Sequence, residues 1–150
     1  MNFEILEGDE VHERPAELVE LCLAAFGEFD PAYLTDRLKT VSAPSLVTAR
    51  GEEGRLAGFK LGYRRGSSLF YSWLGAVHPS ARRQGLASAL MEHQHAWAAR
   101  TGYHQVETRT RAENAAMIVL NLKSGFVITG FETDRHGIGV VTQRKRLSPR

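Results

Sequence analysis

The chain has 150 residues, a length that can bury a sizeable core and fits one domain, with little room for two. Its 19 basic and 17 acidic side chains leave a net charge of +2, which is too balanced to indicate a nucleic-acid partner. A single cysteine, Cys22, excludes an internal disulfide and indicates a reducing compartment.

Hydrophobic periodicity divides the chain into strands and helices. Residues 1–7 carry acids early and do not resemble a signal peptide. No window approaches the roughly 18 apolar residues that span a bilayer, so we expect a cytoplasmic protein without a membrane partner. Pro15 opens the first helix and Asp30 caps the second. The expected elements are, in order, strand 3–6, helices 15–26 and 30–41, strands 45–50, 55–64 and 68–77, helix 86–100, strand 103–110, helix 113–124, and strands 126–132 and 138–146.

This order combines strand–helix–strand crossovers, which give parallel pairs, with hairpins, which give antiparallel pairs. We therefore predict an α/β (α+β) fold, in which a mixed sheet of about six to seven strands carries helices on both faces, as one domain over residues 1–150. Strand 68–77 is the most hydrophobic and is expected at the centre. Gly75 within it is a candidate for a bulge or for close backbone approach. Helix 113–124 is apolar nearly all round, so we expect it to be buried on most sides.

The segment 82–87 lies where strand 68–77 has ended and helix 86–100 begins. A helix N-terminus presents unpaired N–H groups and the positive end of a dipole. A glycine there lets another group approach the backbone, and two arginines add positive charge. These features predict a phosphate-binding turn, although both nucleotide motifs, G-x-x-x-x-G-K-[S/T] and G-x-G-x-x-G, are absent. The residues of this turn are Arg82, Arg83, Gln84, Gly85, Leu86 and Ala87.

Two motifs resemble those of one family. The spacing Arg82-x-x-Gly85-x-Ala87 resembles the [Q/R]-x-x-G-x-[G/A] signature of the GNAT (Gcn5-related N-acetyltransferase) superfamily. The segment 114–126 resembles the later GNAT pattern N-x-x-[A/M]-x-x-x-[Y/N]-x-x-x-G-F. The order of elements matches the GNAT fold along essentially the whole chain. The resemblance implies a GNAT fold and acetyl-CoA, or another acyl-CoA, as co-substrate, with no metal.

The resemblance also implies where the cofactor binds. The backbone of Ala76 and Val77 would bond the pantetheine arm, and the turn 82–87 would hold the pyrophosphate. Asn114 and Asn121 lie on one face of their predicted helix and are candidates to bond the amides of the arm. The alternative is that each asparagine bonds protein backbone, with Asn114 capping the helix.

The catalytic groups are less clearly marked. In the family, a tyrosine commonly protonates the leaving thiolate; the matching residue is Asn121, which can bond the sulfur but cannot give up a proton. Several members place a glutamate base at the position of Tyr71, which is a poor base unless its pKa is shifted. Tyr71 alternatively shapes the acceptor pocket or orders a water. Glu107 is a second candidate base, against the simpler interpretation of an exposed strand carboxylate.

The acceptor site is expected near Phe29, Tyr33, Tyr71 and Trp73, where core packing is the competing interpretation. His93 and His95 point to different faces of a helix, which argues against a metal pair. The resemblance implies an N-acyltransferase that moves an acetyl group from acetyl-CoA to a primary amine by direct attack in a ternary complex. The alternatives are a non-catalytic acyl-CoA-binding sensor or interaction module, and a binder of some other phosphate. The resemblance allows a homodimer, although nothing in the sequence marks an interface.

Overall fold

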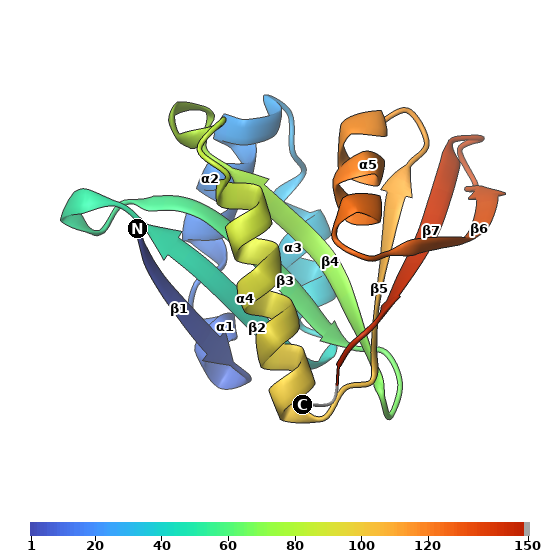
Figure 1. The fold of residues 1–150 in the computed structure, drawn as a ribbon. Coiled ribbons are helices and arrows are strands. Elements are labelled where there is room, and N and C mark those ends of the chain that lie inside the picture. Colours follow the sequence, from blue (N-terminus) through green and yellow to red (C-terminus); the bar gives the residue numbers. More distant parts are fainter. Residues whose placement is uncertain (149–150) are drawn as a thin grey trace.

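The computed structural model describes residues 1–148, in which seven strands form a mixed sheet with helices on both faces (Figure 1). Residues 149 and 150, the end of the expected domain, lie outside the described residues. The strands are β1 (Asn2–Glu7), β2 (Ser42–Arg50), β3 (Leu56–Arg64), β4 (Leu69–Val77), β5 (Gln105–Arg111), β6 (Val127–Thr133) and β7 (Gly139–Arg146). The α-helices are α1 (Asp9–His12), α2 (Pro15–Phe26), α3 (Pro31–Leu38), α4 (Leu86–Thr101) and α5 (Ala115–Lys123).

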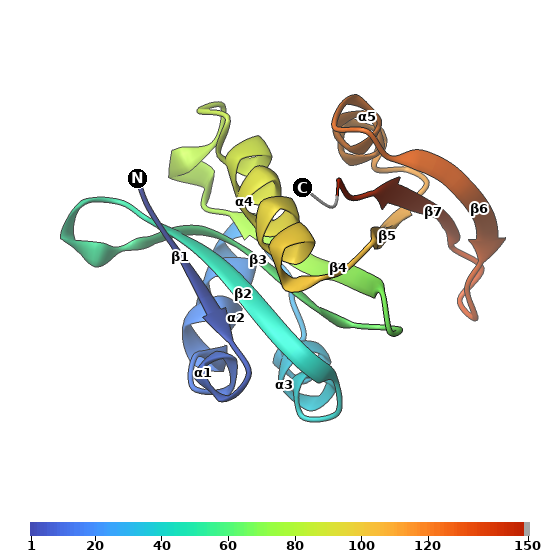
Figure 2. The ribbon, with the colours of Figure 1, turned by 60° about the horizontal axis from the view of Figure 1, so that its bottom comes forward.

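The strand order is β1-β2-β3-β4-β5-β7-β6, and β4–β5 is a parallel pair between antiparallel neighbours. Helices α1, α2 and α3 cover one face of the sheet, while α4 and α5 lie on the other (Figure 2). The predicted mixed sheet with helices on both faces is confirmed. The parallel pair arises because α4 carries the chain from the end of β4 back to the start of β5.

The first two long helices begin as expected, but the second ends early. The Asp30 side chain accepts a hydrogen bond from Ala32 N at 3.0 Å, which confirms Asp30 as the N-cap of α3. The predicted extension of this helix to residue 41 is wrong, because α3 ends at Leu38. Strand β2 instead begins at Ser42, and Pro44 is accommodated by a register shift between Ser42 and Ser45.

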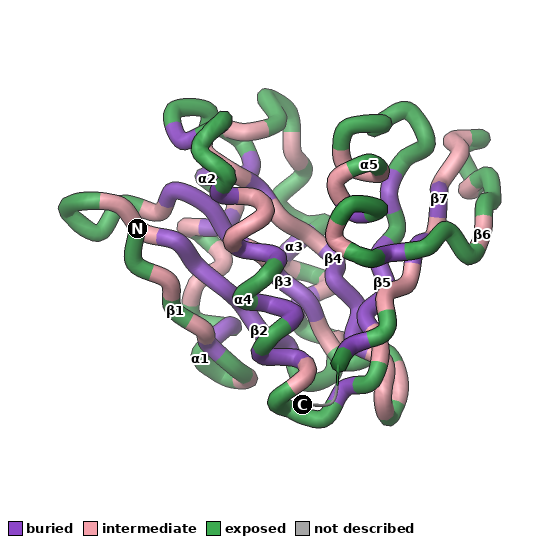
Figure 3. Tube along the Cα trace, in the orientation of Figure 1, coloured by how far each residue is buried: buried purple, intermediate pink, exposed green. Residues whose placement is uncertain are grey.

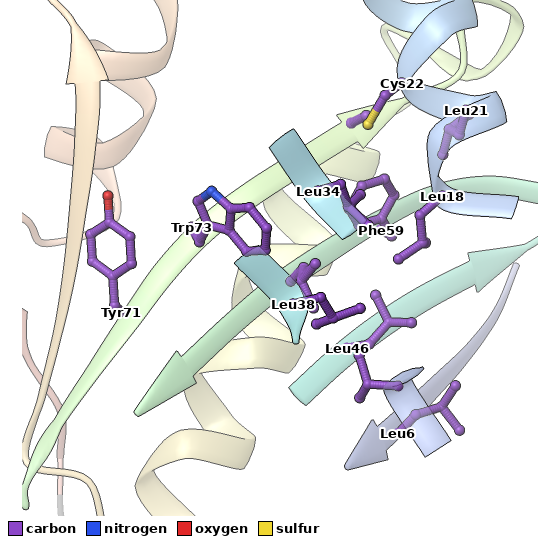
Figure 4. Close-up of a cluster of buried hydrophobic side chains, with 13 residues drawn as sticks. Leu6, Leu18, Leu21, Cys22, Leu34, Leu38, Leu46, Phe59, Tyr71 and Trp73 are labelled. Atoms are coloured by element: carbon purple, nitrogen blue, oxygen red, sulfur yellow. The ribbon is translucent and has the colours of Figure 1, made fainter. Parts of the chain in front are cut away.

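The core lies on both faces of β2, β3 and β4. One apolar cluster packs between the sheet and helices α1 to α3, and includes Leu18, Leu34, Leu46 and Phe59 (Figure 4). Two further clusters lie beneath α4. Burial is concentrated in these central elements, whereas β6 is largely exposed (Figure 3). Cys22 belongs to the first cluster, and burial raises the pKa of its thiol to about 12, which suits a structural residue.

The expectation that the helix following Asn114 is buried on most sides is wrong. Asn121 is the buried residue of α5, while Val119 and Leu122 are 45% and 42% exposed. The physical reason is position: α5 packs beside β6 at the far end of the sheet, so one side of the helix is covered. The apolar composition of α5 therefore does not indicate that the helix is buried.

A bulge in β4 interrupts the pairing with β3. Leu61 pairs with Leu74 and Gly62 pairs with Ser72, so Trp73 is the extra residue. The bulge predicted at Gly75 therefore lies two residues earlier. The alternative for Gly75, close backbone approach, is confirmed, because a Cβ there would lie 3.2 Å from the carbonyl oxygen of Phe59.

The bulge depends on the absence of a side chain at Gly62. A Cβ at this position would lie 2.3 Å from the Phe70 ring and 2.5 Å from the Tyr71 carbonyl oxygen. We predict that Gly62→Ala lowers the free energy of unfolding by about 1–3 kcal/mol and the melting temperature by roughly 2–12 °C. Gly66→Ala is the control, since its Cβ would make an ordinary 3.6 Å contact. Equal melting temperatures for the two variants in thermal denaturation would contradict this account.

Candidate functional site

Strands β4 and β5 pair at one end and separate at the other. Their parallel ladder joins Leu69–Tyr71 to Gln105–Glu107, after which β4 continues to Val77 and β5 to Arg111 as the two diverge (Figure 1). The opening holds a cavity of about 580 Å³, lined mainly by residues of β3, β4, β5, α4 and α5. This is the candidate site.

The edge of β4 that faces the cavity carries free backbone groups. His78 N donates to Ala57 O at 2.8 Å, so the polar groups of residue 78 face β3. Because backbone groups alternate along a strand, the N–H and C=O groups of Val77 and Gly75 point toward the cavity. Such an edge can hydrogen-bond an extended chain that contains amides. The predicted residues Ala76 and Val77 both line the cavity.

The turn 82–87 closes one end of the cavity. Gly85 precedes α4 in a left-handed conformation with φ 72°, and nothing lies within 4 Å of the place its Cβ would occupy. The first N–H groups of α4 are therefore approachable from outside. Arg82 Nη2 donates to the carbonyl oxygen of Ala25 at 2.8 Å, which fixes the guanidinium at the cavity wall. A positive, open helix N-terminus suits a phosphate group.

The turn's remaining predicted residues have different surroundings. Ala87 lines the cavity. Arg83 is exposed, with a left-handed φ of 64°. Gln84 lines a separate cavity of about 480 Å³. Leu86 is 5% exposed and packs in the core beneath α4, so it could contribute its backbone N–H rather than its side chain.

The two asparagines of the second motif also differ. Asn114 lines the cavity, and its Oδ1 accepts a hydrogen bond from Met117 N at 3.2 Å, so it caps α5 as the alternative interpretation held. Asn121 is 2% exposed, and its Nδ2 donates to Gln143 Oε1 at 3.0 Å. Asn121 is not among the cavity-lining residues. The Asn121 amide is therefore already hydrogen-bonded to a protein side chain. The contact predicted between Asn121 and the sulfur of the thioester remains a prediction.

Aromatic side chains gather on the α2–α3 side of the opening. Trp73 lines the cavity and its Nε1 donates to the Tyr33 hydroxyl at 2.8 Å (Figure 4 shows the indole on β4 beside α3). Phe29 packs edge-on against Tyr33 with ring centroids 6.1 Å apart. The Arg37 guanidinium lies 5.2 Å from the Tyr33 ring and 5.1 Å from the Trp73 ring. The structure thus brings together Phe29, Tyr33 and Trp73.

Tyr71 lies deeper, outside the cavity lining. It is 5% exposed, and the Arg65 guanidinium lies 3.9 Å from its ring centroid. Burial raises the pKa of Tyr71 to about 12, although Arg65 opposes the shift. The phenol is therefore protonated at neutral pH. Its role as a base would require a shift in the opposite direction, so the alternatives of shaping the pocket or ordering a water fit this environment better.

Glu107 is a buried ion-pair residue, and the expectation that it is an exposed strand carboxylate is wrong. It is 6% exposed, and its two carboxylate oxygens accept hydrogen bonds from Arg65 and Arg144, each at 2.8 Å. Burial raises the pKa of this carboxyl, but the hydrogen bonds with Arg144 and Arg65 outweigh it and leave the pKa below the usual value. A carboxylate held in this way is a poor proton acceptor.

The sequence interpretation missed Lys60, which lines the cavity from β3. A Cβ at Gly75 would lie 3.5 Å from Lys60 Cδ, so the lysine stem runs beneath Gly75. Burial lowers the pKa of its ammonium to about 8. The sequence signal that could have identified this residue is a lysine between Gly58 and Gly62, on one face of a strand that neighbours the central strand.

The described residues give two further findings. Within residues 1–148, no three His, Cys, Asp or Glu side chains gather where they could hold a metal ion. No helix among these residues is long and apolar enough to cross a membrane. The expectation of no metal stays an expectation.

Several proteins of known structure share this fold. Curated protein sequences give no match to the chain. Solved structures do match it, and three of them have TM-scores of 0.76 to 0.78. The ribosomal-protein-S18-alanine N-acetyltransferase from Escherichia coli is 19% identical, with a TM-score of 0.78 over 98% of this chain and 95% of that one. Ard1 from Thermoplasma volcanium is 21% identical, with a TM-score of 0.77 over 99% of each chain.

A third structure holds a ligand. A GNAT family acetyltransferase from Elizabethkingia anophelis with acetyl-CoA bound is 17% identical, with a TM-score of 0.76 over 97% of this chain and 99% of that chain. At these identities the likeness shows a shared fold. The sequence model of the acetyltransferase (GNAT) family matches residues 13–126, which is most of the chain. The protein therefore belongs to the GNAT acetyltransferase family.

Proposed function

We propose that the protein binds acetyl-CoA or another acyl-CoA between β4 and β5 and transfers the acyl group to a primary amine. The observation that carries this proposal is the free edge of β4, which leads from the cavity to the N-terminus of α4. Coenzyme A has matching parts: a pantetheine arm with two amides and a pyrophosphate. An extended amide chain needs backbone partners, and a phosphate needs a helix N-terminus.

The proposed binding mode assigns each part of the ligand. The pyrophosphate lies on the turn 82–87, where Gly85 leaves open space and Arg82 adds positive charge. The arm runs along β4 and bonds the backbone of Val77, with the thioester near Gly75. The Asn114 side chain reaches the arm from the N-terminus of α5, since Asn114 lines the cavity and its capping bond uses Oδ1, which leaves the amide NH₂ for the ligand.

The reaction proposed is direct attack in a ternary complex. The amine nitrogen attacks the thioester carbonyl, the C–S bond breaks, and CoA leaves as a thiol. The oxyanion that forms accepts a hydrogen bond from the cavity-facing N–H of Gly75. The amine enters from the side of Trp73 and Tyr33, with Phe29 supporting Tyr33. Tyr71 keeps its proton and orders a water that carries the amine proton away, and Asn121 remains the candidate neighbour of sulfur.

A second function, a non-catalytic acyl-CoA-binding module, is favoured by a specific observation. The three groups considered for proton transfer are a buried phenol, a carboxylate in two ion pairs and an amide bound to protein. A binding module would show thermal stabilisation by acetyl-CoA without release of thiol in the presence of any amine. Turnover above the rate of hydrolysis would exclude it.

Gly85 offers a test of the phosphate site. Asp and Asn both tolerate the left-handed conformation and both cap helices, so either substitution preserves the turn. Gly85→Asp places a negative charge where the pyrophosphate is proposed, whereas Gly85→Asn is nearly the same shape without the charge. We predict that acetyl-CoA binds the aspartate variant at least about 10-fold more weakly than the asparagine variant in calorimetric titration. Equal affinities would place the phosphates elsewhere.

Val77 tests the β4 edge. Its N–H points away from β3, so Val77→Pro removes the donor proposed for the pantetheine arm and spares the β3 ladder. We predict that acetyl-CoA affinity falls by about 5- to 10-fold, the factor expected for one hydrogen bond. Val77→Thr keeps the N–H and the branched shape and should bind within about twofold of the wild type. Far-ultraviolet circular dichroism checks that both variants are folded.

The amine reaction itself predicts a pH profile. An amine with a pKa near about 10 is mostly protonated at pH 7, and no candidate base has a pKa raised toward neutrality, so thiol release should rise from pH 7 to 9.5. Tyr71→Phe should lower kcat by roughly 10-fold with unchanged affinity for acetyl-CoA, and the rise with pH should persist. The assay mixes acetyl-CoA with a panel of small and peptide amines. If no amine raises thiol release above hydrolysis, the transferase proposal fails.

A further inference from the structure

A cation that does not belong to the proposed phosphate site lines the cavity. Lys60 on β3 is opposite Gly75 of β4, and its stem passes 3.5–3.6 Å from the position of a Cβ at Gly75. The glycine therefore leaves the path open for the lysine to reach the cavity, which it lines. Gly75 lies two residues before the end of β4 at Val77, and the turn 82–87 follows this same end of the strand.

The charge on Lys60 is not neutralised by a neighbouring side chain. Among residues 1–148, no carboxylate lies within ion-pair distance of its amine. Its titratable neighbour is His95 on α4, whose pKa is lowered to about 3 by burial and by the charges of Lys145 and Lys60, so His95 is neutral. The Lys60 side chain is half-buried, and a charge that is partly removed from water without a partner is costly. An anionic ligand group would remove that cost.

The same end of the cavity is lined with polar groups. Ser72 Oγ donates to Gln94 Oε1 at 2.9 Å, and Thr108 Oγ1 donates to the carbonyl oxygen of Ser72 at 2.9 Å. Gln94 is fully buried, and its Nε2 has no hydrogen-bond partner in the described structure. Gln94 is not among the cavity-lining residues, whereas Lys60 brings its ammonium donor to the cavity itself. The methyl of an acetyl group has no acceptor to offer this donor, whereas a carboxylate does.

We propose that the acyl donor is a CoA thioester of a dicarboxylic acid, such as succinyl-CoA, and that Lys60 binds the distal carboxylate. The inference rests on the proposed function, because it takes the thioester to lie at Gly75 with the pyrophosphate on α4. The acyl chain then extends from Gly75 back along β4, away from the N-terminus of α4 and toward Ser72 and Lys60. In the reaction, the amine nitrogen forms the amide bond, the C–S bond breaks, CoA leaves as the thiol, and the distal carboxylate is unchanged.

The test compares CoA thioesters on three proteins: the wild type, Lys60→Met, and Lys123→Met as a control. Methionine matches the length of the lysine stem without the charge, and Lys123 is an exposed lysine in the last turn of α5. Dissociation constants for CoA, acetyl-CoA and succinyl-CoA are measured by calorimetric titration. We expect the wild type and Lys123→Met to prefer succinyl-CoA over acetyl-CoA by about 10-fold or more. Lys60→Met should reduce this preference to within about twofold and leave acetyl-CoA affinity equal or higher.

The outcomes separate this inference from the proposed function. Tight binding of acetyl-CoA with no preference for succinyl-CoA in the wild type overturns the role of Lys60 and leaves acyl-CoA binding intact. A preference that survives Lys60→Met also overturns it. An acyl mass increment on Lys60 after incubation with either thioester overturns it too, because the lysine would then be an acceptor. Failure of all three CoA compounds to bind would sink the proposed function itself.

Discussion

The separation of β4 from β5 is the constraint on which the site depends. Parallel pairing stops after Tyr71, yet β4 continues for six residues to Val77. The backbone of this segment is paired with β3 on one side, and beyond the Ser72 carbonyl, which accepts a hydrogen bond from Thr108, its other side is open. Buried backbone groups require hydrogen-bond partners, so an open edge inside a fold is either solvated or filled by a ligand. The bulge at Trp73 and the absence of a side chain at Gly62 shape the strand at the point where this edge begins.

The two sides of the opening have different chemistry. On the side of α4 and α5 lie a helix N-terminus, Arg82 and Lys60, all of which favour anions. On the side of α2 and α3 lie aromatic rings, with Trp73 bonded to Tyr33 and a guanidinium stacked against both. An anionic donor with a long arm fits the first side. The second side suits an acceptor with an apolar or aromatic body, and the opening between β4 and β5 connects the two.

The sequence was sufficient for the fold and for the position of the glycine turn at the start of α4, because both follow from local patterns. Strand and helix periodicity, the glycine of the turn 82–87 and the capping role of Asn114 are all encoded over a few neighbouring residues. The bulge at Trp73 was misplaced, because a bulge is defined by pairing with a distant strand. The burial of Glu107 by two arginines and the engagement of Asn121 by Gln143 could not be predicted for the same reason. Lys60 lies in a strand whose alternating pattern is clear from the sequence. Its position in the lining of the cavity could be recognised only in the folded structure.

Amide hydrogen exchange of the backbone tests the central claim most directly. The account predicts that Gly75 and Val77 exchange rapidly without ligand, since their N–H groups face the cavity, and that saturating acyl-CoA slows both. Ala76 and His78, whose N–H groups face β3, should be slow in both states. Strong protection elsewhere in the protein, with Gly75 and Val77 unchanged on binding, would contradict the claim that the open edge of β4 holds the cofactor.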